Sequence, residues 1–110
     1  QWERAARGTD GRTYPWGDEF DKEKCNTTDE SGIGKTTRVT LYPNGISPDG
    51  CYDMAGNVWE WTTSSEGEFR VLRGGSWGGN HGFARCADRF RVSPNVRYFT
   101  AGFRCARAEK

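Results

Sequence analysis

Cysteines are the residues in this chain whose chemistry is easiest to recognise, and there are four: Cys25, Cys51, Cys86 and Cys105. No two of them form a C-x-x-C pair, which argues against a zinc site. Two disulfides formed in an oxidising compartment are the better interpretation, and free buried thiols are the alternative. The sequence does not fix the connectivity, although neighbouring segments suggest Cys25–Cys51 and Cys86–Cys105. Disulfides would favour an extracellular or cell-surface location, which the sequence otherwise leaves unknown.

Two carboxylates flank a glycine-containing turn in "YDMAGNVWEW", residues 52–61. Asp53 and Glu60, together with backbone oxygens, have the chemistry to bind one hard cation such as calcium. The alternative is a tight turn in which Asp53 acts as a cap and Glu60 is solvated. Residue chemistry alone slightly favours the simple turn.

Basic side chains recur through the C-terminal third of the chain, at Arg85, Arg89, Arg91, Arg97 and Arg104. Such a series either forms a site for an anionic ligand or, more often, pairs with Asp and Glu and stacks on aromatic rings. His81 is the only histidine. Because the sequence places no Cys or Ser as its nucleophilic partner, an exposed loop position is expected for it.

The composition bounds the kind of protein. A chain of 110 residues with 34% hydrophobic and 14% aromatic residues fits one domain with aromatic anchors. A net charge of +1 gives no case for nucleic acid binding. No apolar run reaches the length of a membrane span.

The pattern of residue types predicts a β-dominated α+β domain. Residues 1–8, "QWERAARG", are helix formers ended by glycine, which is typical of the last turns of a helix. Strand-like patterns occur in residues 36–42, 57–62, 69–77, 85–92 and 100–108. Residues 9–50 are otherwise rich in turn residues, and so long an irregular stretch is expected to need disulfides or bound cations to hold it.

Five segments occur in a fixed order: "QWERAARG", "YPWGDEF", "GCYDMAGNVWEWT", "RVLRGGSW" and "GFRC". Together they resemble the C-terminal half of the formylglycine-generating enzyme (sulfatase-modifying factor) family. The resemblance covers nearly the whole chain and implies a variant of the C-type lectin fold. Family members normally carry a substantial N-terminal portion before these segments. We therefore expect an N-terminally truncated version of the fold, or one part of a larger protein or assembly.

The family resemblance implies two structural calcium sites. The stronger one would use Asp53, Glu60 and the backbone oxygens of Gly56 and Val58, in the same turn that residue chemistry indicates. The second would lie near four residues: Asn26, Thr27, Ser31 and Ile33. Ser31 stands where family members often have Asp, which weakens this second site.

The family's enzymes oxidise a substrate cysteine with a copper-binding pair of cysteines just after the "RGGSW" strand. The corresponding segment here, residues 78–84, reads "GGNHGFA" and contains no cysteine. Cys86 aligns with a structural cysteine of the family. The resemblance thus implies the scaffold without the catalytic pair, and no bound copper. The alternative function is a formylglycine-generating-type copper-dependent oxidase, or a fragment of a related enzyme.

A second resemblance concerns residues 78–101. The variable proteins of diversity-generating retroelements use the same fold, and template adenines, usually in AAC codons, are randomised in their genes. The resulting NNC codons never encode Lys, Glu, Gln, Met or Trp, and none of these types occurs in residues 78–101. An ordinary glycine-rich loop is the alternative.

This resemblance implies a non-catalytic module that displays a diversified surface, at residues 78–100, to a protein or other ligand. The candidate contact residues are Gly78, Gly79, Asn80, His81, Gly82, Phe83, Asp88, Phe90, Val92, Ser93, Val96, Tyr98, Phe99 and Thr100. The fixed frame between them would be Trp77, Arg85, Cys86, Ala87, Arg89, Arg91, Pro94, Arg97, Gly102, Phe103 and Arg104. The aromatic members of the contact set are expected to be the anchors, because exposed aromatics typically dominate binding energy.

Overall fold

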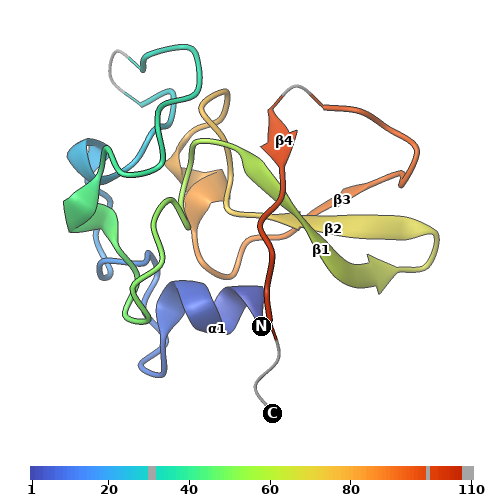
Figure 1. Cartoon of the computed structure of the whole chain (residues 1–110), viewed down its shortest axis with the longest axis horizontal. Helices are drawn as coiled ribbons and strands as arrows, with labels where there is room; N and C mark the ends of the chain where they lie inside the picture. The colour runs from blue at the N-terminus through green and yellow to red at the C-terminus, as the bar shows by residue number, and fades with distance from the viewer. Residues whose placement is uncertain (30–31, 99, 108–110) are drawn as a thin grey trace.

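A four-stranded sheet and one short helix form the regular part of the chain (Figure 1). The computed structural model describes residues 1–29, 32–98 and 100–107. Helix α1 spans Trp2–Arg7, and the strands are β1 (Trp59–Glu66), β2 (Phe69–Arg73), β3 (Phe90–Val92) and β4 (Ala101–Gly102). Single 3-10 turns lie at η1 (Lys22–Lys24), η2 (Pro43–Gly45) and η3 (His81–Ala84). The β-dominated α+β class is confirmed. Within the described ranges, no helix has the length and apolar character needed to cross a membrane.

The strands lie in the order β3-β2-β1-β4. β1 and β2 form an antiparallel hairpin, β3 pairs antiparallel with β2, and β4 runs parallel to β1. Residues directly opposite each other share a face of a sheet. Leu72 and its partner Phe90 therefore lie on one face, which we call the aromatic face. Glu60 and its partner Arg73 lie on the other, which we call the helix face.

Helix α1 covers the helix face through polar contacts. Nε1 of Trp2 donates a hydrogen bond to Oε1 of Glu60 at 3.0 Å. Arg73 on β2 donates from Nη1 to Oε1 of Glu3 at 3.1 Å. The helix ends at Gly8, whose φ of 72° suits a residue without a Cβ. The predicted helix at the start of the chain is confirmed.

The core consists of three small clusters rather than one large one. The cluster beneath α1 contains Ala6, Met54 and Cys86. A second cluster, under the long loop, contains Cys25, Ala55 and Ala84. The third, on the aromatic face, contains Trp59, Leu72 and Val92. Because each cluster joins residues from distant parts of the chain, the loops are fixed at several separate points.

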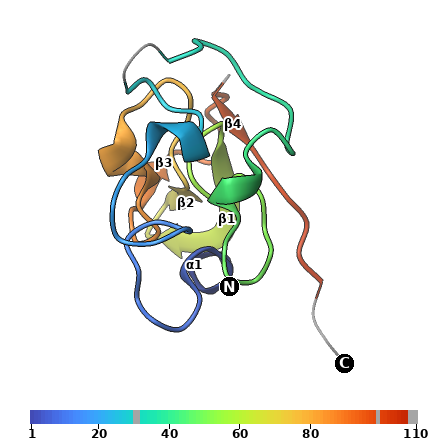
Figure 2. The ribbon, with the colours of Figure 1, turned by 90° about the vertical axis from the view of Figure 1, so that its left-hand side faces the viewer.

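Residues 9–29 and 32–58, which are mostly irregular, lie with the turn η3 on the same side of the sheet, in front of it in Figure 2. Buried Asn57 is one of the groups that hold this segment. Its Oδ1 accepts a hydrogen bond from the backbone N–H of Thr37 at 3.0 Å, and its Nδ2 donates to the carbonyl of the same residue at 3.3 Å. Its own backbone N–H donates to the carbonyl of Asn26 at 2.9 Å. The hydrogen bonds of Asn57 therefore help to hold the long irregular segment, a role that the sequence predicted for disulfides or cations.

Four predicted strands are corrected. Residues 36–42 form turns and irregular backbone, with Val39 64% and Leu41 39% exposed, because the backbone of Thr37 is bonded to the Asn57 side chain and not to a neighbouring strand. Within the described residues, the strands expected over residues 69–77, 85–92 and 100–108 are limited to β2, β3 and β4. The segment before β3 turns away from β2, where the backbone N–H of Cys86 donates to the carbonyl of Thr13 at 2.8 Å.

The predicted disulfides are also corrected, because all four cysteines are free thiols. Cys25 and Cys51 lie in different core clusters, so they do not meet. Cys86 is fully buried whereas Cys105 is exposed. Burial raises the pKa of the Cys25 thiol to about 12 and that of Cys86 to about 11. Both buried thiols are therefore protonated at neutral pH.

Candidate functional site

Four aromatic rings form a continuous row on one side of the molecule, which we call the aromatic row: Phe83, Trp59, Phe90 and Tyr98. The ring centroids of Phe83 and Trp59 are 6.2 Å apart in an edge-to-face arrangement. Trp59 and Phe90 are stacked at 5.2 Å, and Phe90 meets Tyr98 edge-to-face at 6.3 Å. Such pairs contribute about 0.5–1.5 kcal/mol each beyond the area they bury. The rings therefore form one preformed surface.

Each ring of the aromatic row comes from a different segment. Phe83 belongs to η3, Trp59 begins β1, Phe90 begins β3, and Tyr98 lies in the loop before β4. Two backbone hydrogen bonds fix this last loop. The N–H of Trp59 donates to the carbonyl of Thr100 at 2.7 Å, and the N–H of Ala101 donates to the carbonyl of Tyr98 at 3.2 Å. The row thus depends on the tertiary fold.

The aromatic row is buried at its base and exposed along its rim. Trp59 is only 9% exposed and packs against Leu72. Phe83 is 47% exposed, and Phe90 and Tyr98 are each 38% exposed. Clustered exposed aromatics are typical of surfaces that bind a partner. The chemistry this surface offers is apolar and π contact, with one phenol hydroxyl from Tyr98.

The loop before Phe83 is tied to the neighbouring loop through His81. Nδ1 of His81 lies 2.7 Å from Oδ1 of Asp29, and its ring stacks on Phe20 at a centroid distance of 4.7 Å. Although burial raises the pKa of Asp29, its hydrogen bonds with His81 and Thr27 bring the net pKa below the ordinary value. His81 is half exposed, as predicted for a loop histidine, but it has a defined partner.

The glycines and Asn80 of the same loop are also positioned by hydrogen bonds. The carbonyl of Gly79 accepts from the backbone N–H of Thr28 at 3.0 Å. The Asn80 side chain caps η3 by accepting from the N–H of Gly82 at 3.0 Å. Gly78 is exposed beside them. Candidate residues 78–83 therefore form an ordered loop next to the aromatic row.

Two of the candidate contact residues lie elsewhere and are corrected. Val92 is 3% exposed and belongs to the core cluster with Trp59 and Leu72, so it has no surface to offer a ligand. Asp88 precedes β3, so strand alternation does not place it beside Phe90. Its Oδ1 lies 3.3 Å from Nη2 of Arg85, and it lines a separate hollow.

The remaining candidates come from the loop that leads into β4. Val96 is 38% exposed, whereas Ser93 and Thr100 are half-buried. The hydroxyl of Ser93 accepts a hydrogen bond from the backbone N–H of Asn95 at 3.4 Å. Phe99 lies outside the described residues. The structure thus brings this loop to the Tyr98 end of the aromatic row.

Asp53 is the polar residue of the "YDMAGNVWEW" turn that lacks a full set of partners. Its Oδ2 is buried without a hydrogen bond, and its φ is 55°. Burial raises the pKa of Asp53 to about 6, while nearby Arg104 lowers it and Glu60 raises it further. A cation at this position would relieve both the burial penalty and the repulsion.

Glu60 is buried and paired, so the expectation of a solvated Glu60 is wrong. It is 3% exposed, and its two oxygens accept hydrogen bonds from Nε and Nη2 of Arg104 at 2.6 and 2.8 Å. Among the described residues, no three His, Cys, Asp or Glu side chains are grouped to hold one metal ion. A calcium ion beside Asp53 would therefore depend on backbone oxygens such as those of Gly56 and Val58.

The second predicted calcium site falls on a cavity of about 190 Å³ whose lining includes Asn26, Thr27 and Ile33. Oδ1 of Asn26 is buried there without a hydrogen bond. The hydroxyl of Thr27 donates to Oδ2 of Asp29, a carboxylate that also lines this cavity, at 2.9 Å. Ile33 is 50% exposed, and Ser31 lies outside the described residues.

Sequence reasoning missed two residues of these sites. Trp59 belongs to the aromatic row, where it contacts Phe83 and Phe90. The sequence showed only that Trp59 and Trp61 share one face of a strand, and this pattern does not predict either contact. Asp29 bonds His81, but no local pattern links positions 52 residues apart.

Known proteins match both the sequence and the fold. Residues 1–109 match the family model described as the sulfatase-modifying factor enzyme 1-like domain. Treponema denticola variable protein 1 superposes with a TM-score of 0.78 at 30% identity, over 93% of this chain and 43% of that one. The serine/threonine-protein kinase Pkn1 of Chlamydia trachomatis is 39% identical over 100% of this chain and 20% of its own length. The inactive C-alpha-formylglycine-generating enzyme 2 of Bos taurus is 36% identical over 96% of this chain and 41% of its own length.

The sheet, the single helix and these similarities define the class of the domain as the C-type-lectin-like fold of formylglycine-generating enzymes. The chain belongs to the sulfatase-modifying factor enzyme 1-like domain family. It spans between 20% and 43% of the length of the relatives named above, which are longer proteins. Its relatives include both a variable protein and an inactive member of the enzyme family.

Proposed function

We propose that this domain is a non-catalytic module that binds a protein or other surface ligand through the aromatic row. The observation that carries the proposal is an unbroken series of ring contacts. Two partly exposed rings, Phe83 and Phe90, pack on buried Trp59, and Phe90 in turn contacts the partly exposed ring of Tyr98. A rigid, preformed aromatic surface loses little entropy on binding and can dominate the energy of an interface. The similarity to a variable protein and to an inactive enzyme relative supports the same function.

The division between variable and fixed residues supports display of a diversified surface. Residues 78–83 and 93–100 carry most candidate variable positions, and the described parts of these segments, residues 78–83, 93–98 and 100, lie at the two ends of the aromatic row. The frame residues Arg85 and Cys86 instead donate to the carbonyls of Gly82 and Thr13 respectively, and Cys86 is fully buried. A near-copy of the coding sequence for residues 78–101, differing only at adenines and lying beside a reverse transcriptase gene, would be the genomic sign of this function.

The alternative of a copper-dependent oxidase lacks a reactive thiol near the expected place. Residues 74–84, which follow β2, contain no cysteine. The next cysteine, Cys86, is fully buried, and burial raises its pKa to about 11. A buried, protonated thiol is a poor metal ligand and a poor nucleophile. We therefore propose that the domain neither binds copper nor performs the oxidation.

Structural calcium is part of the proposal. Asp53 would supply a carboxylate oxygen, with backbone oxygens of Gly56 and Val58 beside it, and the ion would stabilise the turn before β1. Millimolar calcium should raise the melting temperature of the wild-type chain relative to excess chelator. Asp53→Asn should reduce this shift, because asparagine also tolerates a positive φ but removes the charge. An equal shift in both proteins would place calcium elsewhere.

A peptide library displayed on phage tests the binding surface directly. Peptides selected on the wild-type domain should lose binding to Phe90→Ala and Tyr98→Ala. Phe69→Ala is the matched control, because Phe69 is a 45% exposed ring on the helix face, over which Arg91 stacks. Peptides that lose binding equally to Phe69→Ala, or that ignore the row variants, would contradict the proposal.

A further inference from the structure

A second hollow lies on the α1 side of the molecule, separate from the aromatic row. It has a volume of about 300 Å³ and is lined by Arg7, Thr13, Arg85, Ala87, Asp88 and Arg89. We propose that this hollow binds the tetrahedral oxyanion group, phosphate or sulfate, of a small molecule. None of its lining residues belongs to the aromatic row, so the inference does not rest on the function proposed above.

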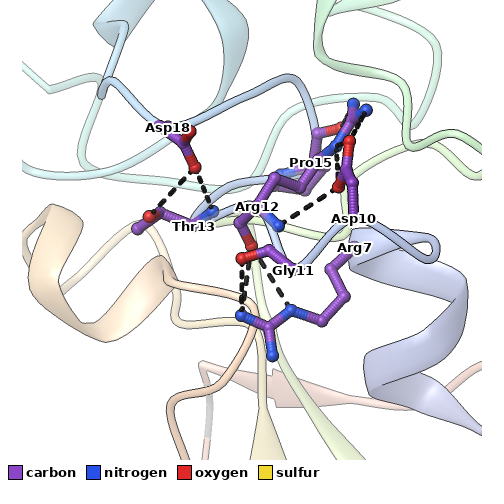
Figure 3. Close-up of polar contacts among 7 residues, drawn as sticks. All are labelled: Arg7, Asp10, Gly11, Arg12, Thr13, Pro15 and Asp18. Carbon is purple, nitrogen blue, oxygen red and sulfur yellow. Dashed lines mark hydrogen bonds and ion pairs between the residues drawn. The ribbon is translucent and has the colours of Figure 1, made fainter.

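One wall of the hollow is fixed by the turn after α1 (Figure 3). Arg7 donates from Nη2 to the carbonyl of Gly11 at 3.2 Å, and from both Nε and Nη2 to the carbonyl of Arg12 at 3.3 Å. Thr13 is held by Asp18, which accepts from its backbone N–H at 3.0 Å. Arg7 also forms an ion pair from Nη1 to Oε2 of Glu3 at 2.6 Å, and the hydroxyl of Thr13 donates to Oδ1 of Asp18 at 3.4 Å. Both side chains are thus set in place before any ligand arrives.

The same turn is braced from outside by a second ion pair. Arg12 bonds Asp10 through Nη2 at 2.7 Å and also donates from Nη1 to the carbonyl of Pro15 at 3.2 Å. The hydrogen bond from Arg12 lowers the pKa of Asp10 to about 2. Arg12 therefore serves the turn and does not line the hollow.

The other wall comes from the segment before β3. Cys86 joins the two walls, because its backbone N–H donates to the carbonyl of Thr13 at 2.8 Å. Arg85 donates from Nε to the carbonyl of Gly82 at 2.9 Å and meets Asp88 at 3.3 Å. Arg89 has a looser partner, since its Nη1 lies 3.9 Å from Glu66 and its side chain is 42% exposed. Its planar fork is therefore available for a ligand.

The charge of the lining selects an anion. Three guanidinium groups and one hydroxyl line the hollow with one carboxylate, that of Asp88. Two carboxylates outside the lining bind donors of the hollow: Glu3 pairs with Arg7 at 2.6 Å, and Asp18 accepts from the Thr13 hydroxyl at 3.4 Å. Arg89, whose pair is the longest, is therefore the main donor left for an anion. Arginine donors suit tetrahedral oxyanions because their N–H groups bind two oxygens at once. The volume lies at the lower end of the roughly 300–1,000 Å³ that small-molecule sites occupy. The hollow therefore fits a small anionic group.

The structure divides the arginine series that the sequence presents. Arg104 is taken up by Glu60, and Arg91 stacks over the Phe69 ring at 5.9 Å, so both have structural partners. Arg85 and Arg89 instead converge with Arg7, which is 78 positions earlier than Arg85 in the chain. Structural pairing therefore describes Arg91 and Arg104, whereas the interpretation as an anion site applies to Arg85 and Arg89.

Titration calorimetry with inorganic phosphate, at ionic strength kept constant with chloride, tests the proposal. Arg89→Gln and Arg85→Gln should each weaken phosphate binding roughly tenfold or more, since each removes a charge-assisted donor. Arg38→Gln is the matched control, because Arg38 is exposed and lies outside the hollow. A second titration with sulfate tells which of the two oxyanions the hollow prefers, and saturable binding of either supports the site.

Asp88→Asn should increase the affinity for phosphate, and a misfolded protein would not show such an increase. Removing the carboxylate frees Arg85 and lowers the repulsion of an incoming anion, so phosphate binding should tighten several-fold. Thermal unfolding of each variant checks that the fold is intact. Absence of binding to both anions, an Arg38→Gln loss as large as the Arg89→Gln loss, or weaker binding by Asp88→Asn would each overturn the proposal.

Discussion

The two faces of the sheet are formed by the same strands but differ in how far their functional side chains are buried and paired. On the helix face, Glu60 is 3% exposed and both of its oxygens are hydrogen-bonded by Arg104, with Trp2 as a further donor. On the aromatic face, Phe90 and Tyr98 each remain 38% exposed. A buried charge needs partners from the same chain, whereas a ring tolerates partial exposure. The Glu60 site on the helix face is therefore satisfied within the chain, whereas the rings of the aromatic face have surface left for a ligand.

The largest effect is expected on the helix face. Glu60→Ala should lower the free energy of unfolding by about 3–5 kcal/mol, because it leaves the donors of Arg104 and Trp2 without their buried acceptor. Urea denaturation in the presence of a chelator measures this loss without a contribution from calcium. Glu66→Ala is the control on the same strand, since its pair with Arg89 is long and partly exposed and should contribute less than about 1 kcal/mol. Equal losses would show that burial does not distinguish the two carboxylates.

Thiol reactivity tests how tightly the residues beneath the helix face are packed. Burial raises the pKa of Cys86 from 9.0 to about 11, which leaves roughly 100-fold less thiolate at neutral pH. Iodoacetamide should therefore label exposed Cys105 and half-buried Cys51 in the native chain, and Cys25 and Cys86 only after unfolding. Peptide mass spectrometry identifies the labelled positions. Rapid native labelling of Cys86 would show that the cluster under α1 opens readily.

A smaller loss is expected at the centre of the aromatic face. Phe90→Ala should cost about 1–2 kcal/mol, less than a fully buried phenylalanine, because the ring is partly exposed but stacks on Trp59. Phe69→Ala on the opposite face should cost less, since its 45% exposed ring meets the guanidinium of Arg91, at 5.9 Å, and not a buried tryptophan. Urea denaturation compares the two variants. A loss of 3 kcal/mol or more, as about expected for a core ring, would assign Phe90 to the core and weaken its role as a contact residue.

The smallest effect is expected at the end of the row. Tyr98→Ala should change the free energy of unfolding by less than about 1 kcal/mol, because the ring is 38% exposed and its contact with Phe90 is edge-to-face at 6.3 Å. Thermal unfolding measures it, with Val96→Ala as a neighbouring control of equal exposure. A Tyr98→Ala loss that exceeds the Phe90→Ala loss would mean that this ring holds the loop before β4, and that the row is structural.

Local sequence patterns predicted the parts of the chain that have regular secondary structure. Alternation in residues 57–62 and 69–77 predicted the two longest strands, although the second ends at Arg73, and Gly8 predicted the end of α1. The order of the aromatic segments indicated the family, and the restricted set of residue types in residues 78–101 indicated a surface that varies. Each of these properties is set by neighbours within a few residues, or by the order of segments. They can be read without coordinates.

The tertiary structure alone decided which distant groups meet. Glu60 bonds Arg104 across 44 positions, and Asp29 bonds His81 across 52. Val92 has the residue type of a variable position, yet the packing of Trp59 and Leu72 buries it. All four cysteines are free thiols, although neighbouring segments suggested pairs. The physical reason is that periodicity sets the direction of a side chain within its own segment, whereas its partner is set by how the loops return over the sheet.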